Sequence, residues 1–373
     1  MNMKIKFFDL EAQMSLVRER IDNGVRDVLN HGQFIQGPEV EILEQQLSDT
    51  VGCDCIAVSS GTDALLLSLL ALNIGPGDEV IVPSFSFIST VEVVVLIGAT
   101  PVYVDCELLT GNMDVSSLAS VITSRSRAII PVSLYGQPAD MDEINEIARQ
   151  NELAVIEDGA QSFGASYKNG YSGSLSTIGC TSFFPTKPLG CYGDGGAVFT
   201  KNKDLSQRVR QLRTHGQSQR YVHELPGICG RLDTIQAAVL LAKLEIFNQE
   251  LIQRERVAKN YIRLLEERCS ECILDGKLTL MHVKPDRKSV YAQFTVRVRD
   301  RENVRVSLEQ SGVPTFVHYP MAFCDQPAYS KFTREISAVM NSRILASEVL
   351  SLPMHPYLKD VEQEFVVDAL SRS

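Results

Sequence analysis

The chain has 373 residues, 44% hydrophobic and 22% charged, with a formal net charge of −10. This length predicts a large domain with a smaller companion, and the acidic balance argues against nucleic-acid binding, which favours basic surfaces. No apolar run reaches the roughly 20 residues of a membrane helix and residues 1–9 lack a signal-peptide core, so we expect a cytoplasmic protein with no membrane partner.

The first part of the chain alternates between helical and strand patterns. Helices are expected at 13–31 and 38–49, and a leucine-rich helix from Asp63 to about Asn73. Apolar strands are expected, in chain order, at 79–82, 101–104, 128–134, 154–156, 180–184 and 197–200. Because these strands are apolar throughout and helices separate them, the pattern indicates an α/β fold with a mostly parallel central sheet covered by helices.

The second part begins with a long helical pattern over 233–267. We expect this helix to link a large α/β domain, residues 1–240, to a smaller α+β C-terminal domain, residues 241–373. The smaller domain is predicted to contain a strand at 291–298, a helix at 304–311 and a final helix near 337–350.

Nine cysteines are scattered along the chain, an odd number that does not fit a secreted disulfide framework. Cys269 and Cys272 form a lone C-x-x-C, whereas a zinc site needs a second pair nearby, and Cys53 and Cys55 are the only close pair. We therefore expect no metal.

Lys187 lies in the most informative segment, Phe183-Phe-Pro-Thr-Lys-Pro-Leu-Gly-Cys-Tyr-Gly-Asp-Gly-Gly196. Prolines on both sides stiffen the backbone just after a predicted strand, and the glycines allow close approach to a ligand. In α/β folds ligands bind beyond the carboxyl ends of the strands, where Asp158, Ser182 and Lys187 all fall. Such a lysine could form a Schiff base with an aldehyde cofactor, although a lysine considered alone is more often a solvated surface residue.

Two other segments fit the same kind of cofactor. Asp158 follows a buried strand and could hold a pyridine nitrogen protonated, or it could simply cap the next helix. Ser60-Gly-Thr-Asp63 opens a helix whose free amides could receive a phosphate, or it could be a plain N-cap. Neither segment decides the question alone.

Taken together, these segments resemble the sugar aminotransferases of the DegT/DnrJ/EryC1/StrS family, within the fold-type I aminotransferases that use pyridoxal 5'-phosphate. The resemblance covers nearly the whole chain. It is carried by the motifs above and by Gly32-Gln-Phe-Ile-Gln-Gly-Pro38, Gly77-Asp-Glu-Val-Ile-Val-Pro83, Glu157-Asp-Gly-Ala-Gln161, Gly230-Arg-Leu-Asp233, His318-Tyr-Pro320 and Leu352-Pro-Met-His355. Lysine at 187 also separates the chain from related sugar dehydratases, which carry histidine there.

The resemblance implies a role for each site residue. Lys187 would form the Schiff base and move the proton, and Asp158 would pair with the pyridine nitrogen. Gln161 would bind near the ring hydroxyl, and Phe87 would stack on the ring. The phosphate would be held by Gly61, Thr62 and Ser182, and the substrate by Arg231, His318 and Tyr319.

The family also implies a homodimer with shared active sites, and here the sequence departs from the pattern. The stretch G-x-N-x-R, which reaches the neighbouring subunit's cofactor, reads Gly227-Ile-Cys-Gly-Arg231, so Cys229 replaces asparagine. This puts the cross-subunit phosphate contact in doubt. Arg231 is retained and could meet a substrate carboxylate or phosphate, or form an interface ion pair.

The lysine segment and Ser289-Val-Tyr-Ala-Gln-Phe-Thr-Val296 look like family members that aminate C3 of UDP-2-acetamido-2-deoxy-3-oxo-glucuronate for surface polysaccharides such as O-antigen. Glutamate is the expected amino donor. The alternatives are an aminotransferase for another 3-keto or 4-keto nucleotide sugar, or a protein that binds pyridoxal phosphate as a sensor without catalysis.

Overall fold

The computed structural model describes residues 5–332 and 339–373, and in them seven strands form the central sheet in the order β1-β9-β8-β5-β4-β2-β3. Their bounds are Asp54–Val58 (β1), Glu79–Pro83 (β2), Thr100–Val104 (β3), Ser126–Ile129 (β4), Ala154–Asp158 (β5), Ile178–Ser182 (β8) and Gly196–Thr200 (β9). Strands β3, β2, β4, β5 and β8 pair in parallel, and β9 runs antiparallel to β8 and β1. The prediction of a mostly parallel sheet is confirmed.

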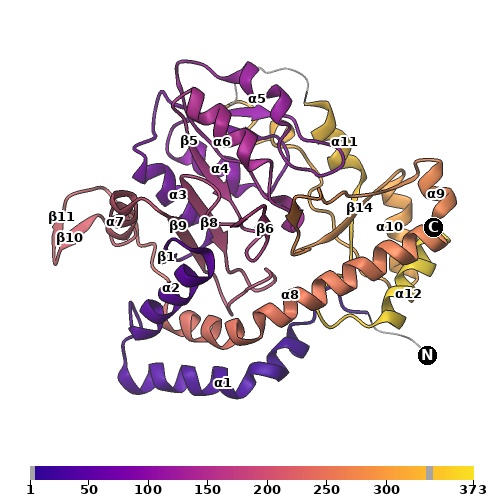
Figure 1. Cartoon of the computed structure of the whole chain (residues 1–373), viewed down its shortest axis with the longest axis horizontal. Coiled ribbons are helices and arrows are strands. Elements are labelled where there is room, and N and C mark those ends of the chain that lie inside the picture. Colours follow the sequence, from indigo (N-terminus) through magenta and orange to yellow (C-terminus); the bar gives the residue numbers. More distant parts are fainter. Residues whose placement is uncertain (1–4, 333–338) are drawn as a thin grey trace.

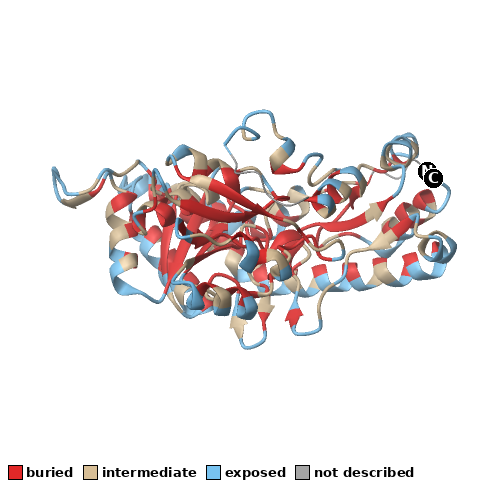
Figure 2. Ribbon diagram, turned by 90° about the horizontal axis from the view of Figure 1, so that it is seen from above, coloured by how far each residue is buried: buried red, intermediate tan, exposed pale blue. Residues whose placement is uncertain are grey.

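Helices cover both faces of this sheet because its strands are apolar on both sides (Figure 2). In β1, Ile56 and Val58 enter one core, and Cys55 and Ala57 enter the opposite one. The first face carries α3 (Gly61–Ala71), α4 (Ser89–Leu96) and α7 (Lys203–Leu212). The second carries α1 (Leu10–His31), α2 (Pro38–Val51), α5 (Val115–Val121), α6 (Met141–Gln150) and the start of α8 (Thr234–Arg268).

The C-terminal part has a core of its own around a three-stranded antiparallel sheet. The sheet consists of β12 (Leu278–Leu280), β14 (Phe294–Val298) and β15 (Val349–Leu352), and the surrounding helices are α9 (Ser270–Leu274), α10 (Arg301–Gln310), α11 (Met340–Glu348) and α12 (Asp360–Leu370). Figure 1 shows α8 running from beneath the central sheet to this part. The predicted domain boundary at residue 240 falls inside α8 and stays a prediction.

Short elements complete the fold. The strands β6 (Ser166–Tyr167), β7 (Gly170–Tyr171) and β13 (Arg287–Lys288) form a small sheet. A hairpin of β10 (Gln217–Gln219) and β11 (Val222–His223) projects from the body of the molecule (Figure 1). Single 3-10 turns lie at Leu134–Gly136 and Phe323–Asp325.

Three sequence-based expectations about elements were wrong in part. The strand expected at 128–134 ends at Ile129, and a 3-10 turn occupies Leu134–Gly136. The strand expected at 291–298 begins at Phe294. Residues 337–338 of the expected final helix lie outside the described residues, and α11 ends at Glu348 because Val349–Leu352 pairs with β14 as strand β15. α12 follows, so α11 is not the final helix.

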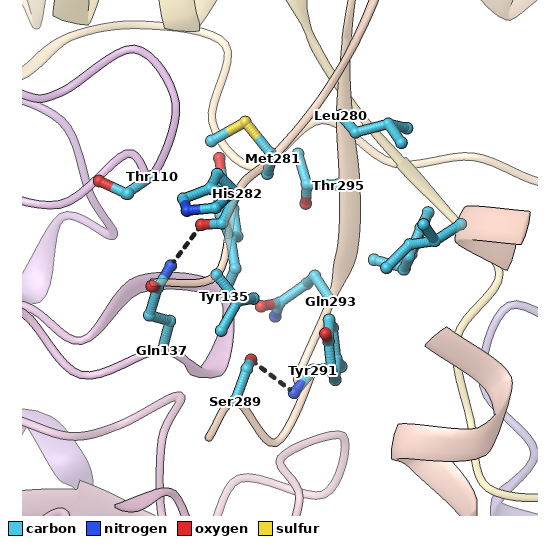
Figure 3. A pocket seen from close by; sticks show the side chains of 13 residues that line it. Thr110, Tyr135, Gln137, Leu280, Met281, His282, Ser289, Tyr291, Gln293 and Thr295 are labelled. Atoms are coloured by element: carbon cyan, nitrogen blue, oxygen red, sulfur yellow. Dashed lines mark hydrogen bonds between the residues drawn. The ribbon is translucent and has the colours of Figure 1, made fainter. Parts of the chain in front are cut away.

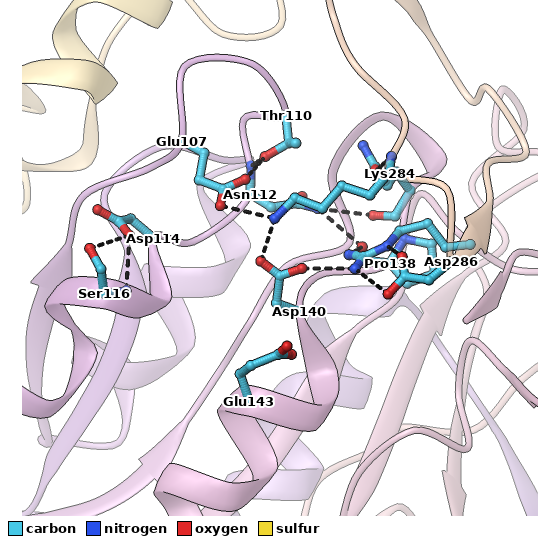
Figure 4. A network of polar contacts seen from close by, with 12 residues as sticks. Glu107, Thr110, Asn112, Asp114, Ser116, Pro138, Asp140, Glu143, Lys284 and Asp286 are labelled. Carbon is cyan, nitrogen blue, oxygen red and sulfur yellow. Dashed lines mark hydrogen bonds and ion pairs between the residues drawn. The ribbon is translucent and has the colours of Figure 1, made fainter. Parts of the chain in front are cut away.

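A polar network joins the two parts of the molecule (Figure 4). The carboxylate of Asp140 accepts from Lys284 Nζ at 2.6 Å and from Arg287 Nη2 at 2.8 Å. Lys284 also donates to Glu107, on the loop after β3, at 3.0 Å. This network fixes the segment between β12 and β14 against loops that follow β3 and β4.

A small cavity of about 30 Å³ lies beside this network (Figure 3). Tyr135 and Gln137 line it from the large part, and Met281, Tyr291 and Gln293 from the C-terminal segment. A cavity of this size has room for about two water molecules at most. The junction is therefore closely packed rather than open.

Candidate active site

The first component of the site is the N-terminus of α3. Ser60 caps the helix, its hydroxyl accepting from the amide of Asp63 at 3.0 Å, and leaves the amides of Gly61 and Thr62 at the helix start. A Cβ on Gly61 would lie 2.7 Å from Cβ of Ser182, so only glycine lets these segments approach so closely. The predicted phosphate ligands Gly61, Thr62 and Ser182 thus surround a helix terminus whose dipole favours an anion.

Lys187 lies in the loop that follows β8. Its amide donates to the carbonyl of Phe184 at 2.9 Å, which closes a tight turn, and Phe183 is tied back to Gly195 at 2.7 Å. Burial lowers the pKa of Lys187 to about 8, and the nearby Asp158 carboxylate opposes that change. A lowered pKa gives the lysine a larger fraction of free amine near neutral pH, as a Schiff-base nucleophile requires.

Asp158 ends β5 and is 5% exposed. One carboxylate oxygen accepts from Thr90 Oγ at 2.8 Å, and the other accepts from the amide of Ala160 at 3.2 Å. Burial raises the pKa of Asp158, and these two donors and Lys187 act in the opposite direction. The residues after Asp158 form a turn rather than a helix, so the carboxylate does not act as a helix cap.

Gln161 has a fixed amide orientation. Its oxygen accepts from the amide of Tyr135 at 2.7 Å, so its nitrogen must be the donor, and it donates to the hydroxyl of Tyr319 at 2.9 Å. The hydroxyl of Tyr135 donates to the carbonyl of His318, joining this group to the C-terminal part. The ring of Phe87 is half exposed and lies 5.8 Å from the ring of Tyr319.

His318 stands beside these groups. Its Nδ1 lies 2.8 Å from the hydroxyl of Ser351. Burial lowers the pKa of His318 to about 4, and the charge of Lys187 lowers it further in the same direction. The imidazole is therefore neutral at neutral pH and can offer a hydrogen bond but no charge.

Arg231 lies next to the start of α3, because it bridges to Val58 and its neighbour Gly230 accepts from the amide of Ser59 at 3.0 Å. Its Nη2 is 3.0 Å from the sulfur of Cys229, which is exposed. Among the described residues its Nε has no hydrogen-bond partner. The guanidinium thus remains available to an anion beside the site.

The structure brings the predicted residues together at one edge of the central sheet. Gln161, three residues beyond Asp158 at the end of β5, donates to Tyr319, and the ring of Phe87 lies 5.8 Å from the Tyr319 ring. The charge of Asp158 raises the pKa of Lys187, and the charge of Lys187 lowers the pKa of His318. Sequence reasoning missed Thr90. A threonine in the first turn of an apolar helix gives no local signal, and its bond to Asp158 exists only once α4 packs beside β5.

These residues fit pyridoxal phosphate on structural grounds. The glycine-permitted approach of Gly61 to Ser182 shapes an anion site at a helix N-terminus. The same site contains the buried carboxylate of Asp158 and Lys187, whose pKa burial lowers to about 8. Phosphate, pyridine nitrogen and aldehyde each have a suitable partner.

The described residues hold no group of three or more histidine, cysteine, aspartate or glutamate side chains placed to bind a metal ion. All nine cysteines are free. Over residues 5–332 and 339–373, none of the helices has the length and apolar character needed to cross a membrane.

Comparison with known proteins also indicates an aminotransferase. The family model of the DegT/DnrJ/EryC1/StrS aminotransferases matches residues 16–371. The UDP-2-acetamido-2-deoxy-3-oxo-D-glucuronate aminotransferase of Pseudomonas aeruginosa is 49% identical over 98% of this chain and 99% of its own. A solved DegT DnrJ EryC1 StrS aminotransferase from Brucella abortus has a TM-score of 0.92 and 37% identity, covering 98% of each chain. A Bacillus subtilis protein with bound cofactor PMP has a TM-score of 0.87 and 32% identity, covering 95% of this chain and 81% of its own.

Fold and site are thus those of a sugar aminotransferase that depends on pyridoxal phosphate. The chain belongs to the DegT/DnrJ/EryC1/StrS aminotransferase family. The expected fold-type I architecture and the expected cofactor are confirmed.

Proposed function

We propose that the protein transfers an amino group from glutamate to the 3-keto carbon of UDP-2-acetamido-2-deoxy-3-oxo-glucuronate. The observation that carries this proposal is the 49% identity, over 98% of the chain, to the Pseudomonas aeruginosa aminotransferase named for that sugar. The product would be an amino sugar nucleotide for surface polysaccharide synthesis.

Lys187 is the proposed catalytic residue. Its amine would hold the cofactor by its aldehyde, and the same amine would serve as the acid and base of the amino transfer. When bound, pyridoxal phosphate supplies an electron sink for the negative charge that this proton transfer creates. The pKa of about 8 leaves Lys187 able both to accept and to return a proton near neutral pH.

The other residues hold the cofactor in place. Asp158 would hold the pyridine nitrogen protonated, and Thr90 orients Asp158 and favours its ionised form by donating to it at 2.8 Å. Gln161, whose nitrogen donates to the Tyr319 hydroxyl at 2.9 Å, has a second N–H that would serve the ring hydroxyl. Gly61, Thr62 and Ser182 bind the phosphate, and Phe87 packs on the ring.

We assign the sugar nucleotide to Arg231, His318 and Tyr319. A uronate carries a carboxylate, and Arg231 is the cation of this group because burial lowers the pKa of His318 to about 4. His318 and Tyr319 then serve as neutral hydrogen-bonding groups.

We also propose a homodimer that shares its active sites. The β10–β11 hairpin projects from the body of the molecule with Tyr221 79% exposed, and Cys229, two residues before Arg231, is also exposed, so both offer surface to a partner subunit (Figure 1). Two-fold dimers are the commonest closed assembly.

The test is an absorbance spectrum of the purified protein supplied with pyridoxal phosphate, with and without glutamate, repeated on Lys187→Ala. We expect a visible band that glutamate bleaches in the wild type and that the variant does not form. Addition of the 3-oxo uronate to the bleached enzyme should restore the band and yield the amino sugar by mass spectrometry. No band in the wild type contradicts the cofactor role of Lys187. A band restored better by a 4-keto sugar nucleotide than by the uronate contradicts the substrate.

A further inference from the structure

Lys243 is a buried cation that the proposed chemistry does not use. It lies on α8, on the side that faces the central sheet, and its side chain is 1% exposed. Its ammonium donates to the carbonyl of Gly190 at 2.6 Å and lies 4.2 Å from the centre of the Tyr192 ring. Both contacts are to the segment that leads away from Lys187.

Gly190 supports the turn that carries Lys187. A Cβ on Gly190 would lie 2.6 Å from the carbonyl oxygens of Phe184 and Pro185, so this residue packs directly against the backbone of the turn. Phe184 in turn accepts from the amide of Lys187 at 2.9 Å. A displacement of Gly190 therefore moves the backbone to which the catalytic side chain is attached.

Gln236, also on α8, binds the same segment at Tyr192. Its side-chain oxygen accepts from the amide of Tyr192 at 2.8 Å. Gln236 and Lys243 are seven residues apart on α8, so they project from the same face of the helix. We call residues 190–193 the return arm of the loop. Two side chains of α8, Gln236 and Lys243, thus bind this return arm.

An uncharged side chain could fill the space that Lys243 occupies. A buried ammonium costs free energy that a methionine of similar volume would avoid. Burial lowers the pKa of Lys243 to about 8, and Glu250, seven residues further along α8, acts against that change. Glu250 itself is engaged by Gln13 at 2.9 Å and by the hydroxyl of Tyr357.

We infer that Lys243 is a positioning residue for Lys187: through Gly190 and Tyr192, with Gln236, it sets where the catalytic amine stands relative to Asp158. The inference rests on the proposed role of Lys187 in binding the cofactor. It assigns a function to α8 beyond linking the two parts of the chain.

The test compares Lys243→Met with Gln236→Met in the holoenzyme. The readouts are the melting temperature, kcat and KM for glutamate, and the pH midpoint of the visible cofactor band, which reports the surroundings of Lys187. We expect Lys243→Met to keep or raise the melting temperature, since it removes a buried charge. We expect kcat to fall between about tenfold and about a hundredfold, as a displacement of about 1 Å would produce, with KM within about twofold and the pH midpoint shifted.

Gln236→Met distinguishes an effect of loop position from an effect of charge, because it removes a hydrogen bond to the return arm without removing a charge. A shifted pH midpoint in both variants supports the inference. A shift of the pH midpoint in Lys243→Met alone would indicate a long-range charge effect and would overturn the inference. An unchanged midpoint in both variants would overturn it as well. If Lys243→Met fails to fold, Gln236→Met decides in the same way.

Lys259→Met is the matched control. Lys259 lies on the same helix, is 72% exposed and pairs only with the neighbouring Glu255 among the described residues, so this change should leave all readouts unaltered. Lys187→Ala distinguishes the two proposals. If that variant keeps the band, the proposed function fails. If it loses the band while Lys243→Met and Gln236→Met behave as wild type, only the positioning role fails.

Discussion

The hydroxyl of Thr90 has the largest share among the groups that favour the ionised form of Asp158. Burial raises the pKa of this carboxyl, and the bond from Thr90 is the strongest effect in the other direction. Thr90→Val keeps the shape of the side chain and removes the donor, so we expect the ionised form of Asp158 to become less favoured and its pairing with the pyridine nitrogen weaker. The dissociation constant for pyridoxal phosphate should rise about tenfold, the value of one hydrogen bond to a charged group.

The measurement is a fluorescence or absorbance titration of the apoenzyme with the cofactor. Thr90→Ser, which retains the hydroxyl, is the control and should bind nearly as the wild type does. Equal affinity in the valine and serine variants would show that Thr90 only fills space.

Arg231 offers a second test at this scale, because its Nε has no hydrogen-bond partner among the described residues. If the guanidinium binds the uronate carboxylate, Arg231→Ala should raise KM for the uronate about tenfold to a hundredfold, the worth of a charge-assisted hydrogen bond. KM for the matching sugar without the carboxylate should change far less. Steady-state kinetics with both sugars decides, and an equal rise for the two would remove Arg231 from carboxylate recognition.

Single residues became candidates through the joint pattern of their segments and the family resemblance, since none of these segments decides alone. Lys187 between prolines, Asp158 at a strand end and the Ser60–Thr62 helix start are visible in the sequence. Thr90 and Lys243 were not, because their importance lies in partners 68 and 53 residues away. A threonine or a lysine in a helix looks ordinary until tertiary packing buries it.

At the scale of elements, the sequence predicted helices and strands correctly where local residue patterns determine them. It failed where pairing with a distant strand determines the structure. The helices of the first part follow from apolar periodicity and from caps such as Ser60. Val349–Leu352 continues a helical pattern, yet it becomes strand β15 because Thr295 and Val296 of β14 pair with it. α12 was missed, although Glu362 returns a hydrogen bond to the amide of Lys359 at 2.8 Å, a capping signal at its start.

Strand β5 ends in two adjacent carboxylates that point to opposite faces of the sheet, and they have different tasks. Asp158 faces the site, whereas Glu157 is fully buried and accepts from Ser172 Oγ at 2.6 Å and from the amide of Gly173 at 2.9 Å. Burial raises the pKa of Glu157 to about 7 against these hydrogen bonds. Glu157 therefore makes the stability of the fold depend on pH.

The sign of that dependence follows from proton uptake. Between about pH 4.5 and about pH 7 folded Glu157 holds a proton that the unfolded chain has lost, so the wild type loses stability as pH rises through this window. Glu157→Gln has no such titration. We expect the wild-type minus variant difference in unfolding free energy to fall by on the order of 3 kcal/mol across the window and to be flat above it.

Urea unfolding at a series of pH values measures this difference. Glu146→Gln is the control: hydrogen bonds from Arg149 and Gln150 lower the pKa of this exposed carboxyl, so its effect should appear only at lower pH and with the opposite sign. A pH-independent difference for Glu157→Gln would mean that the buried carboxyl does not titrate in this window.

At the scale of the whole molecule, the two parts are joined by α8 and by the Asp140 network. Asp140 is 14% exposed in its side chain and bridges Lys284 to Arg287, whose side chain is 3% exposed (Figure 4). The same junction contains Tyr135, which holds Gln161 and contacts His318. Stability of the junction and geometry of the site are therefore linked through one set of contacts.

Asp140→Asn tests that link. The substitution keeps the shape and leaves two cations short of a carboxylate, although Glu107 still accepts from Lys284 and Asp286 from Arg287. We expect a loss of about 2 kcal/mol in unfolding free energy, less than the about 3–5 kcal/mol of a fully buried pair with one partner removed. We also expect KM for the sugar nucleotide to rise, because His318 and Tyr319 belong to the part that the network holds.

Asp142→Asn is the matched control on the neighbouring helix. Its carboxylate pairs with Lys168, and the two side chains are 58% and 46% exposed, so the loss should stay below about 1 kcal/mol with KM unchanged. Equal losses in the two variants would show that the network is no stronger than a surface ion pair. A large loss of stability with unchanged KM would instead mean that the site keeps its geometry without the network, held by the hydrogen bonds from Tyr135 to His318 and from Gln161 to Tyr319.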